Sequence, residues 1–356
     1  MKTHRIAVIP GDGVGPEVVE EGLRVMQAAQ SLSAGSPLEL ERFSWGSEFY
    51  LTTGTMMPSD ALQTLASFDA IYLGAVGDPR VPDDVTLHGL LLPIRKAFDQ
   101  YACVRPIYLY PGVCSPLADK ASGSIDMVVI RENTEGEYAD VGGRVYPGSP
   151  HEVAIQAGIF TRHGTERVIR YAFDLARQPG RRKKVTSITK SNAQRFGMVF
   201  WDEVFRVVAK DYPEVATESQ LVDAACMNFV RKPESFDVVV ASNLFGDILT
   251  DLGAIIVGGM GLAPSGNINP SKAHPSMFEP THGSAPDIAG KGMANPLAAI
   301  LTGAMMLEFL GEAKSASLIR KAVASSLAQG QARTPDLGGS ARTGEVGDEL
   351  LAMMRR

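Results

Sequence analysis

Two aspartates stand four residues apart in the segment 242–251, directly after the apolar run 237–241. If a helix begins at about Ser242, Asp247 and Asp251 lie on one face of it, one turn apart. Like charges at that spacing repel each other unless a cation lies between them or solvent screens them. Ligation by oxygen alone is typical of Mg2+ or Mn2+. Such a pair taken alone is more often a solvated helix face, although the apolar neighbours here argue against full solvation.

Three arginines are candidates to bind a small anionic substrate. Arg95 lies on a predicted helix that begins near Leu90, Arg105 follows ten residues later, and Arg131 ends the predicted strand 125–130. A guanidinium group binds a carboxylate bidentately and stays charged, so the three could hold two carboxylates. Each alone is also compatible with an ordinary surface arginine. A charge at the end of a buried strand makes Arg131 the strongest candidate.

A tyrosine and a lysine close two further segments. Tyr138 ends the segment 131–138, and Lys190 follows the predicted strand 184–189. Such side chains can serve as acid and base if neighbouring cations lower their pKa values. Their spacing alone does not assign these roles.

The segment 282–295 is rich in small residues and predicts a loop that can approach a ligand closely. Asn295 and Pro296 then predict the start of a helix over 296–310. The alternative is an ordinary surface loop, but long ordered loops are usually functional.

The glycine-rich turn 11–16 follows a strand, as a dinucleotide-binding fingerprint does. Pro16 replaces the third glycine of that fingerprint, and no acidic residue ends a second strand about 20 residues later. We interpret the segment as a tight turn with Pro16 near the first helical position. A nucleotide site is therefore expected elsewhere.

Short β-branched runs alternate with helical patterns along the chain, which predicts an α/β fold. The expected strands are 5–9, 69–76, 125–130, 184–189 and 237–242, with helices over 15–30 and 90–101. Several Gly and Pro and a short apolar alternation over 139–158 predict a two-stranded arm that needs a partner surface. With 356 residues and no obvious linker, two interleaved domains are expected.

The composition is that of an ordinary globular protein, with 45% hydrophobic and 21% charged residues. The formal net charge of −6 argues against nucleic acid as a partner, since phosphate binding leaves a basic footprint. Three widely spaced cysteines suit a reducing compartment. The longest apolar stretch, 297–307, is far shorter than the ~20 residues of a membrane span, and no secretory signal is evident. We therefore expect a cytoplasmic protein without membrane association.

Four motifs together resemble the β-decarboxylating dehydrogenases, the family of isopropylmalate, isocitrate, homoisocitrate, tartrate and D-malate dehydrogenases. They are RENTEGEY (131–138), TKSN (189–192), SNLFGDILTDL (242–252) and EPTHGSAPDIAGKGMANP (279–296). The match covers nearly the whole chain. It implies two interleaved α/β domains of the isopropylmalate dehydrogenase type, not a Rossmann fold, with the arm 139–158 at a dimer interface. Residues 1–101 plus 257–356 would form a discontinuous cofactor-binding domain, and 102–256 the domain for substrate, metal and dimerisation.

The resemblance also implies roles for the candidate residues. The carboxylate-binding arginines would be Arg95, Arg105 and Arg131. Tyr138 would protonate the enol left by decarboxylation, and Lys190 would accept the proton of the substrate hydroxyl. The Mg2+ or Mn2+ ligands would be Asp223, Asp247 and Asp251. Asp223 is also expected to be a catalytic residue. In the family the counterparts of Lys190 and Asp223 come from the second subunit, which implies a homodimer with shared active sites.

The resemblance places the cofactor on the loop 282–295. The expected cofactor-binding residues are His282, Gly283, Ser284, Ala285, Pro286, Asp287, Ile288 and Asn295. A carboxylate at Asp287 accepts hydrogen bonds from a ribose 2′-hydroxyl and repels a 2′-phosphate, which favours NAD over NADP. The sequence leaves open whether a monovalent cation assists.

The substrate is expected to be a small 2-hydroxy dicarboxylate. Isocitrate is disfavoured because Gly89 and Leu91 stand where isocitrate dehydrogenases carry Ser-x-Asn before the arginine. His88 and Leu91 are expected to contact the substrate. The segments 45–48, 54–58, 81–84 and 98–101 resemble tartrate and D-malate dehydrogenases, so the expected reaction is NAD-dependent oxidation with decarboxylation of D-malate, to pyruvate and CO2, or of tartrate. One alternative is 3-isopropylmalate; another is a non-catalytic regulatory subunit, which the complete set of catalytic side chains opposes.

Overall fold

The computed structural model describes residues 3–356 and divides into two compact units. The first unit comprises the chain up to Gln100, Arg105–Ile125 and Ala254–Arg356, and the second comprises Tyr101–Val104 and Asp126–Gly253. Both units are mixed α/β, and each is built from separate stretches of the chain. The expected fold class, interleaved α/β, is therefore confirmed.

Residues 105–125 lie in the first unit, whereas the expected division placed 102–256 together in the second. Hydrogen bonds from side chains to the backbone hold them there. Arg333 donates to the carbonyl of Gly112 (2.6 Å), and the hydroxyl of Ser115 donates to the carbonyl of Ile256 (2.6 Å). Contacts of this kind leave no periodic pattern in the sequence, so the expected boundary missed them.

The first unit is a sheet in the order β2-β1-β3-β12-β11. Its strands are β1 (His4–Gly11), β2 (Leu38–Arg42), β3 (Ala70–Ala75), β11 (Pro264–Ile268) and β12 (Ser276–Pro280). Its helices are α1 (Gly15–Leu32), α2 (Ser47–Thr53), α3 (Ala61–Leu65), α4 (Asp83–Thr86), α5 (Leu92–Ala97), α10 (Leu297–Phe309), α11 (Ala313–Gln329) and α12 (Thr343–Met354). The strands pair in parallel except for β11 and β12, which are antiparallel. This order differs from that of a Rossmann fold.

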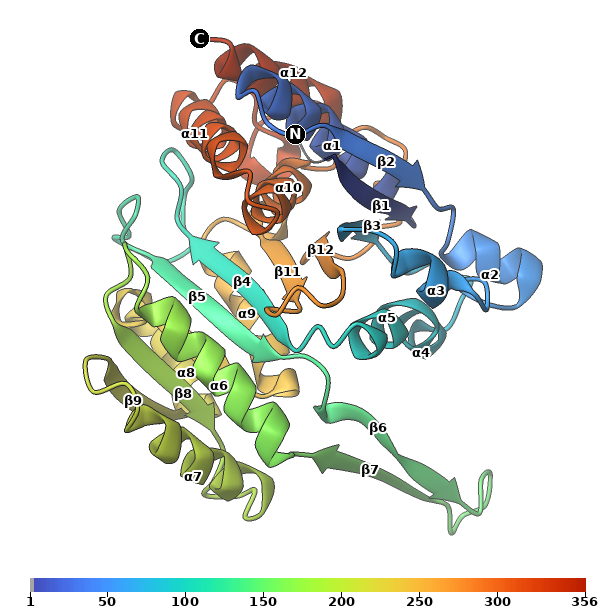
Figure 1. Ribbon diagram of the computed structural model, residues 1–356, viewed down its shortest axis with the longest axis vertical. Helices are drawn as coiled ribbons and strands as arrows, with labels where there is room; N and C mark the ends of the chain where they lie inside the picture. Colours follow the sequence, from blue (N-terminus) through green and yellow to red (C-terminus); the bar gives the residue numbers. More distant parts are fainter. Residues whose placement is uncertain (1–2) are drawn as a thin grey trace. The chain divides into compact units, whose positions relative to one another are not determined.

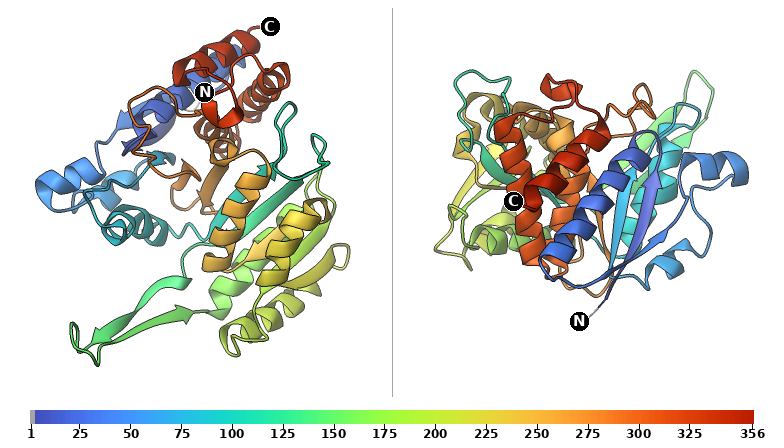
Figure 2. Two further views of the ribbon diagram at one scale, coloured as in Figure 1. Left: turned by 180° about the vertical axis from the view of Figure 1, so that it is seen from behind. Right: turned by 90° about the horizontal axis from the view of Figure 1, so that it is seen from above.

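Alternate residues of the central strands face opposite sides of this sheet, as the strand repeat of two requires. Ile9 and Leu73 pack with Ile94 of α5 in one buried cluster. On the other face, the hydroxyl of the fully buried Tyr72 donates to the carbonyl of Ala299 in α10 (2.7 Å). Figure 2 shows α1, α10, α11 and α12 packed beside one another. Of the helices between residues 3 and 356, none is both long and apolar enough to cross a membrane.

The helix expected over 90–101 begins earlier and contains an irregular turn. α4, a π-helical turn at Leu87–Leu91 and α5 follow one another directly. Pro93 cannot donate a backbone hydrogen bond, and the N–H of Leu92 bonds to the carbonyl of Leu87 in the wider π pattern. Such turns are frequent at functional sites. This one carries His88.

The second unit is a parallel sheet in the order β5-β10-β8-β9 (Figure 1). Its strands are β5 (Asp126–Glu132), β8 (Lys184–Thr189), β9 (Ala216–Leu221) and β10 (Val238–Ala241), and β4 (Ala102–Tyr108) carries the chain into the first unit. Its helices are α6 (Arg162–Ala176), α7 (Gly197–Ala209), α8 (Val222–Arg231) and α9 (Asn243–Ile256). Helices α6 and α7 cover one face, and α8 and α9 the other (Figures 1 and 2). Parallel strands end at the same edge, so the segments after β5, β8, β9 and β10 share that edge.

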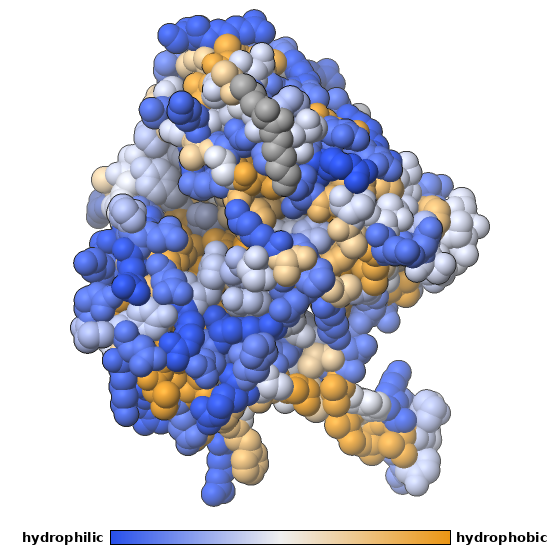
Figure 3. Space-filling view, in the orientation of Figure 1, coloured by the Kyte–Doolittle hydropathy of each residue, from blue (hydrophilic) through white to orange (hydrophobic). Residues whose placement is uncertain are grey.

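A two-stranded antiparallel arm, β6 (Gly136–Val145) and β7 (Val153–Ile159), projects from the second unit. It lies where the sequence predicts one, at 139–158. Apolar side chains gather along it (Figure 3), and Tyr146 and Ile155 are 66% and 59% exposed. Exposed apolar side chains in such density are typical of a surface that another chain covers.

Candidate active site

Arg131, Tyr138 and Asp247 meet at the carboxyl edge of the second unit's sheet. The Arg131 guanidinium pairs with one carboxylate oxygen of Asp247, and the Tyr138 hydroxyl donates to the other (3.1 Å). The guanidinium carbon lies 5.4 Å from the centroid of the Tyr138 ring. Arg131 is buried, while the Asp247 side chain remains about one-third exposed, at 35%. A cation, a phenol and a carboxylate from three elements therefore converge on a point that solvent reaches.

The pKa of Tyr138 is raised, so neighbouring cations do not lower it here. Burial is the largest cause, and the negative charge of Asp247 follows it. The Arg131 charge acts in the opposite direction without outweighing them. Tyr138 therefore keeps its proton at neutral pH and suits the role of a proton donor.

Lys190 and Asp223 form a second pair at the same edge. Lys190 follows β8, Asp223 lies in the first turn of α8, and their charged groups are 2.9 Å apart. The hydrogen bond from Lys190 lowers the pKa of Asp223. Both side chains are accessible to solvent, at 27% and 59%. The pair is thus placed where it could meet groups of another chain.

The three predicted metal ligands do not gather within one chain. Asp247 and Asp251 lie one turn apart on α9, as the sequence predicts, with Asp251 exposed. Asp223 lies with Lys190 instead. Between residues 3 and 356, no group of three or more His, Cys, Asp or Glu side chains is arranged to hold a metal ion.

The other two candidate arginines lie buried in the first unit. Arg95, on α5, is 5% exposed and donates to Glu279 (2.7 Å), which also accepts a hydrogen bond from Asn267 (2.8 Å). Arg105, on β4, is 7% exposed. Removing such charges from water is costly unless they are paired. The burial of both arginines therefore indicates a role other than keeping the protein in solution.

His88 and Leu91, the expected substrate contacts, lie on the π-helical turn in different surroundings. His88 is exposed and lines a groove of about 500 Å3 with Tyr50, Met56 and Met57 among others. Leu91 is 7% exposed and belongs to the buried core cluster of the first unit. Whether either side chain contacts a substrate stays a prediction.

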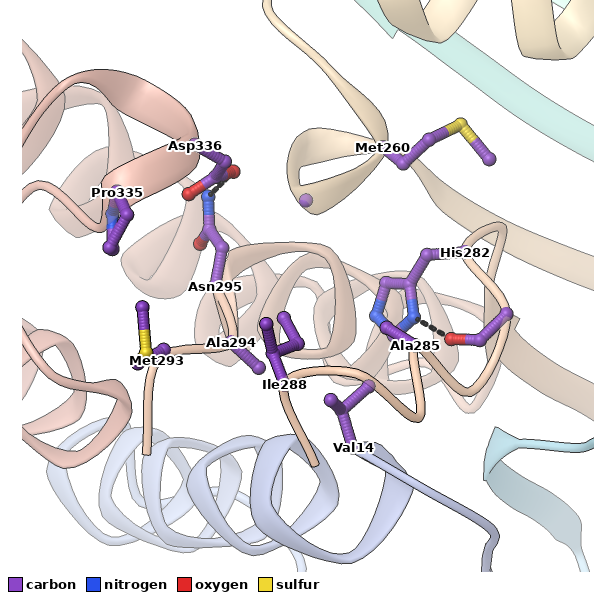
Figure 4. Close-up of a pocket in the computed structure, with 12 residues that line it drawn as sticks. Val14, Met260, His282, Ala285, Ile288, Met293, Ala294, Asn295, Pro335 and Asp336 are labelled. Atoms are coloured by element: carbon purple, nitrogen blue, oxygen red, sulfur yellow. Dashed lines mark hydrogen bonds between the residues drawn. The ribbon is translucent and has the colours of Figure 1, made fainter. Parts of the chain in front are cut away.

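The loop after β12 borders a mostly apolar pocket of about 700 Å3 in the first unit (Figure 4). Of the expected cofactor residues, the pocket is lined by His282, Gly283, Ala285, Ile288 and Asn295. Ser284 is buried, and Pro286 and Asp287 are exposed, outside that lining. Met293 and Ala294 of the same loop also line it, and the sequence did not predict the remaining walls, which are Val14, Met260, Gly261, Pro335 and Asp336. They come from separate segments that only folding brings together.

His282 contributes an unsatisfied acceptor to this pocket. Its Nδ1 lies 2.9 Å from the carbonyl of Gly283, and a carbonyl only accepts, so Nδ1 carries the proton. Burial lowers the pKa of His282, which keeps the ring neutral. Its Nε2 is enclosed and makes no hydrogen bond within the described chain. A ligand with a hydroxyl or amino group, such as a nucleotide, would satisfy it.

The glycine-rich turn 11–16 supports this loop. The N–H of Val14 donates to the carbonyl of Ser284 (2.8 Å). Gly13 has φ +57°, and a Cβ there would lie 2.0 Å from the same carbonyl oxygen. The turn is therefore no phosphate-binding fingerprint, yet its glycine lets the backbone approach the loop and brings Val14 into the pocket wall.

Glu132 follows Arg131 in the chain and is buried. Hydrogen bonds within its own turn hold its carboxylate. Its carboxylate accepts from the N–H (2.9 Å) and hydroxyl (2.9 Å) of Thr134 and from the N–H of Glu135 (3.0 Å). Burial raises the pKa of Glu132 to about 7 despite these bonds. The protonated form is therefore favoured on folding.

Replacing Glu132 with glutamine is expected to flatten the pH dependence of stability. Since the folded pKa exceeds the unfolded one, the stabilisation from this group is present at low pH and is lost as the pH rises through about 7. Wild type should therefore lose more thermal stability than Glu132→Gln between about pH 5 and about pH 9. Circular dichroism melts across that range test this. Parallel pH profiles of the two proteins would contradict it.

Comparison with known proteins defines the class of this molecule. The family model described as isocitrate/isopropylmalate dehydrogenase matches residues 5–350, and the chain belongs to that family. It is accordingly an oxidoreductase, as the motifs indicated. It is 52% identical to D-malate dehydrogenase (decarboxylating) of Escherichia coli (strain K12), over 100% of both chains. It is 50% identical to tartrate dehydrogenase/decarboxylase of Pseudomonas putida, over 99% of this chain and 98% of that protein. The solved structure of isocitrate dehydrogenase from Methylococcus capsulatus matches with a TM-score of 0.89 at 36% identity, covering 99% of this chain and 100% of that one.

Proposed function

We propose that this protein oxidises and decarboxylates D-malate, to pyruvate and CO2, or tartrate, with NAD as hydride acceptor. The observation that carries the proposal is the convergence of Arg131 and Tyr138 on Asp247, which joins an anion-binding group, a proton donor and a metal-binding oxygen. The names of the two relatives at 50% identity or more support the choice of substrate.

The aspartates of α9 suit a divalent metal. Asp247 and Asp251 offer only oxygen donors on one helix face, and Asp247 is open to solvent on one side. Asp223 of a second subunit would complete the set. A bound Mg2+ or Mn2+ would stabilise the negative charge that develops on the substrate oxygens.

The side chains around this position can then move the protons. Arg131 would hold a substrate carboxylate. The Nζ of Lys190, contributed by a second subunit, would accept the hydroxyl proton as hydride leaves for NAD. After the carboxylate β to the new ketone departs, Tyr138 would return a proton to the carbon of the enol. The raised pKa of Tyr138 supports this assignment.

The pocket beside the loop 282–295 suits the adenosine part of NAD. It is lined mainly by apolar side chains, and the free acceptor on His282 and the carboxylate of Asp336 offer polar contacts. Asp287 is exposed on this loop, and its carboxylate would accept hydrogen bonds from a ribose 2′-hydroxyl and repel a 2′-phosphate. We therefore propose NAD as the preferred cofactor.

We propose a homodimer in which each active site uses both subunits. Lys190 and Asp223 lie together, apart from Asp247 and Asp251, as two halves of one site would. Apolar side chains of helices α8 and α9 are also exposed, among them Met227 at 57% and Ile248 and Ile255 at 51% each. A second copy would cover them and the arm.

Steady-state assays with Mn2+ and NAD test the substrate. We expect kcat/KM for D-malate or tartrate to exceed that for 3-isopropylmalate by at least about tenfold, because a pocket shaped for the smaller diacid would gain little from the isopropyl group. A dominant kcat/KM for 3-isopropylmalate would favour that alternative, and a higher kcat/KM with NADP would contradict the cofactor assignment. Binding of Mn2+ and NAD without turnover of any diacid would favour a regulatory subunit.

A further inference from the structure

The loop between Arg131 and Tyr138 is joined to the first turn of α9 by a carboxylate that the proposed mechanism does not use. Glu137 accepts a hydrogen bond from the hydroxyl of Ser242 (3.1 Å) and another from the backbone N–H of Leu244 (3.1 Å). The N–H groups of a first helical turn have no partner within the helix, and the helix dipole favours a negative charge there. Glu137 therefore caps α9 from outside the helix.

Asn243 strengthens the same connection. Its side-chain amide donates to the carbonyl of Glu135 (3.0 Å), and its oxygen accepts from Nε of Arg131 (2.9 Å). The side chain is 2% exposed, so water does not compete for these bonds. Asn243 and Asp247 are four residues apart and share one face of α9. Consecutive turns of one helix thus bind Arg131 at two atoms.

The three glutamates of the segment 131–138 differ in what they hold. Glu132 closes its own turn. Glu135 accepts from the N–H (2.9 Å) and hydroxyl (2.7 Å) of Thr161, at the start of α6. Glu137 alone of these three is bonded by its side chain to α9. Glu137 directly precedes Tyr138 in the chain. Its contact with the start of α9 therefore determines the backbone position from which the tyrosine side chain extends toward Asp247.

We propose that Glu137 is a positioning residue that aligns the Tyr138 hydroxyl with Asp247. This inference rests on the proposed function, in which Tyr138 donates a proton. Its two hydrogen bonds fix Glu137 at the start of α9, and Asp247 lies one turn further along the same helix. The hydroxyl and the carboxylate are thereby held at 3.1 Å as one rigid arrangement. Displacement of a reacting group by about 1 Å can cost about a hundredfold in rate.

The first test replaces Glu137 with glutamine and uses Glu135→Gln as the matched control. The two bonds reach different oxygens of Glu137, and glutamine replaces one of these oxygens with an NH2 donor and has no charge, so it cannot accept both bonds in this geometry. We expect Glu137→Gln to lower kcat by about 10-fold to 100-fold with KM for the substrate changed less than about threefold. Glu135→Gln, which faces α6, should retain kcat within about threefold of wild type.

A double-variant cycle distinguishes positioning of Tyr138 from general damage. In a Tyr138→Phe background, Glu137→Gln should lower kcat by less than about threefold, because the group that it positions is already gone. An unchanged kcat or full additivity with Tyr138→Phe would overturn the proposal.

Two further measurements keep the outcome clear. If Glu137→Gln does not fold, Ser242→Ala removes one of the same two bonds and should give a smaller change of the same sign. If wild type turns over no diacid, the proposed function fails. The positioning role is then tested by NMR of 13C-labelled tyrosine, assigned with Tyr138→Phe. A Tyr138 resonance with the same chemical shift in wild type and Glu137→Gln would overturn it.

Discussion

Replacement of Asp247 by asparagine is expected to reduce kcat by about a thousandfold and to abolish measurable Mn2+ binding at concentrations that saturate wild type. The amide keeps the shape of the side chain but loses the charge that both a divalent cation and Arg131 need. Titration calorimetry with Mn2+ and steady-state rates with D-malate measure the two effects.

Asp174 offers a matched control for this charge removal. It lies on α6 in the same unit. Its carboxylate accepts a hydrogen bond from the hydroxyl of Tyr212 (3.1 Å), which is not a residue of α9. Asp174→Asn should therefore bind Mn2+ and turn over substrate as wild type does. Wild-type Mn2+ affinity in Asp247→Asn would refute the assignment of Asp247 as a ligand.

Mixed dimers that carry one Lys190→Ala subunit and one Asp247→Asn subunit are expected to recover about half of wild-type activity, although each variant alone is inactive. Lys190 and Asp223 lie apart from Asp247 within one chain, so each site would take its base from one subunit and its α9 ligands from the other. One of the two sites in a mixed dimer then contains every wild-type group, whereas the other contains both defects.

The experiment uses coexpressed subunits with two different tags, so that only mixed dimers are isolated. Dimers that combine Asp247→Asn with Asp251→Asn serve as the control, because both defects fall in the α9 half and every site stays broken. No recovery in the Lys190→Ala pair would show that the sites are not shared, and recovery in the control would show that Asp247 and Asp251 do not belong to the same half of a site. Tags that never copurify would show that no stable dimer forms.

The structure changes the expected surroundings of particular side chains more than it changes which residues are candidates for the site. The aspartate pair on one face of α9 and the arm were predicted from local patterns, and both elements are present. The pKa of Tyr138 is raised, because burial and Asp247 outweigh Arg131. Sequence spacing cannot state how deeply a side chain is buried, and burial dominates that pKa.

The sequence by itself determined the fold class, the family and the residue types of the site. Periodicity is a local property, so the strands β5, β8 and β10 and the first turn of α9 could be predicted from neighbouring residues. The sequence motifs likewise pointed to Lys190, Asp223 and Asp247 as candidate site residues without any coordinates.

Only the tertiary structure decided which of these groups meet. It joins Arg131 and Tyr138 to Asp247, leaves Lys190 with Asp223, and brings Val14 and Asp336 to one nucleotide-sized pocket. It also joins Glu137 to the start of α9. These contacts connect segments tens to hundreds of residues apart, and their geometry follows from how sheets and helices pack, which no local pattern encodes.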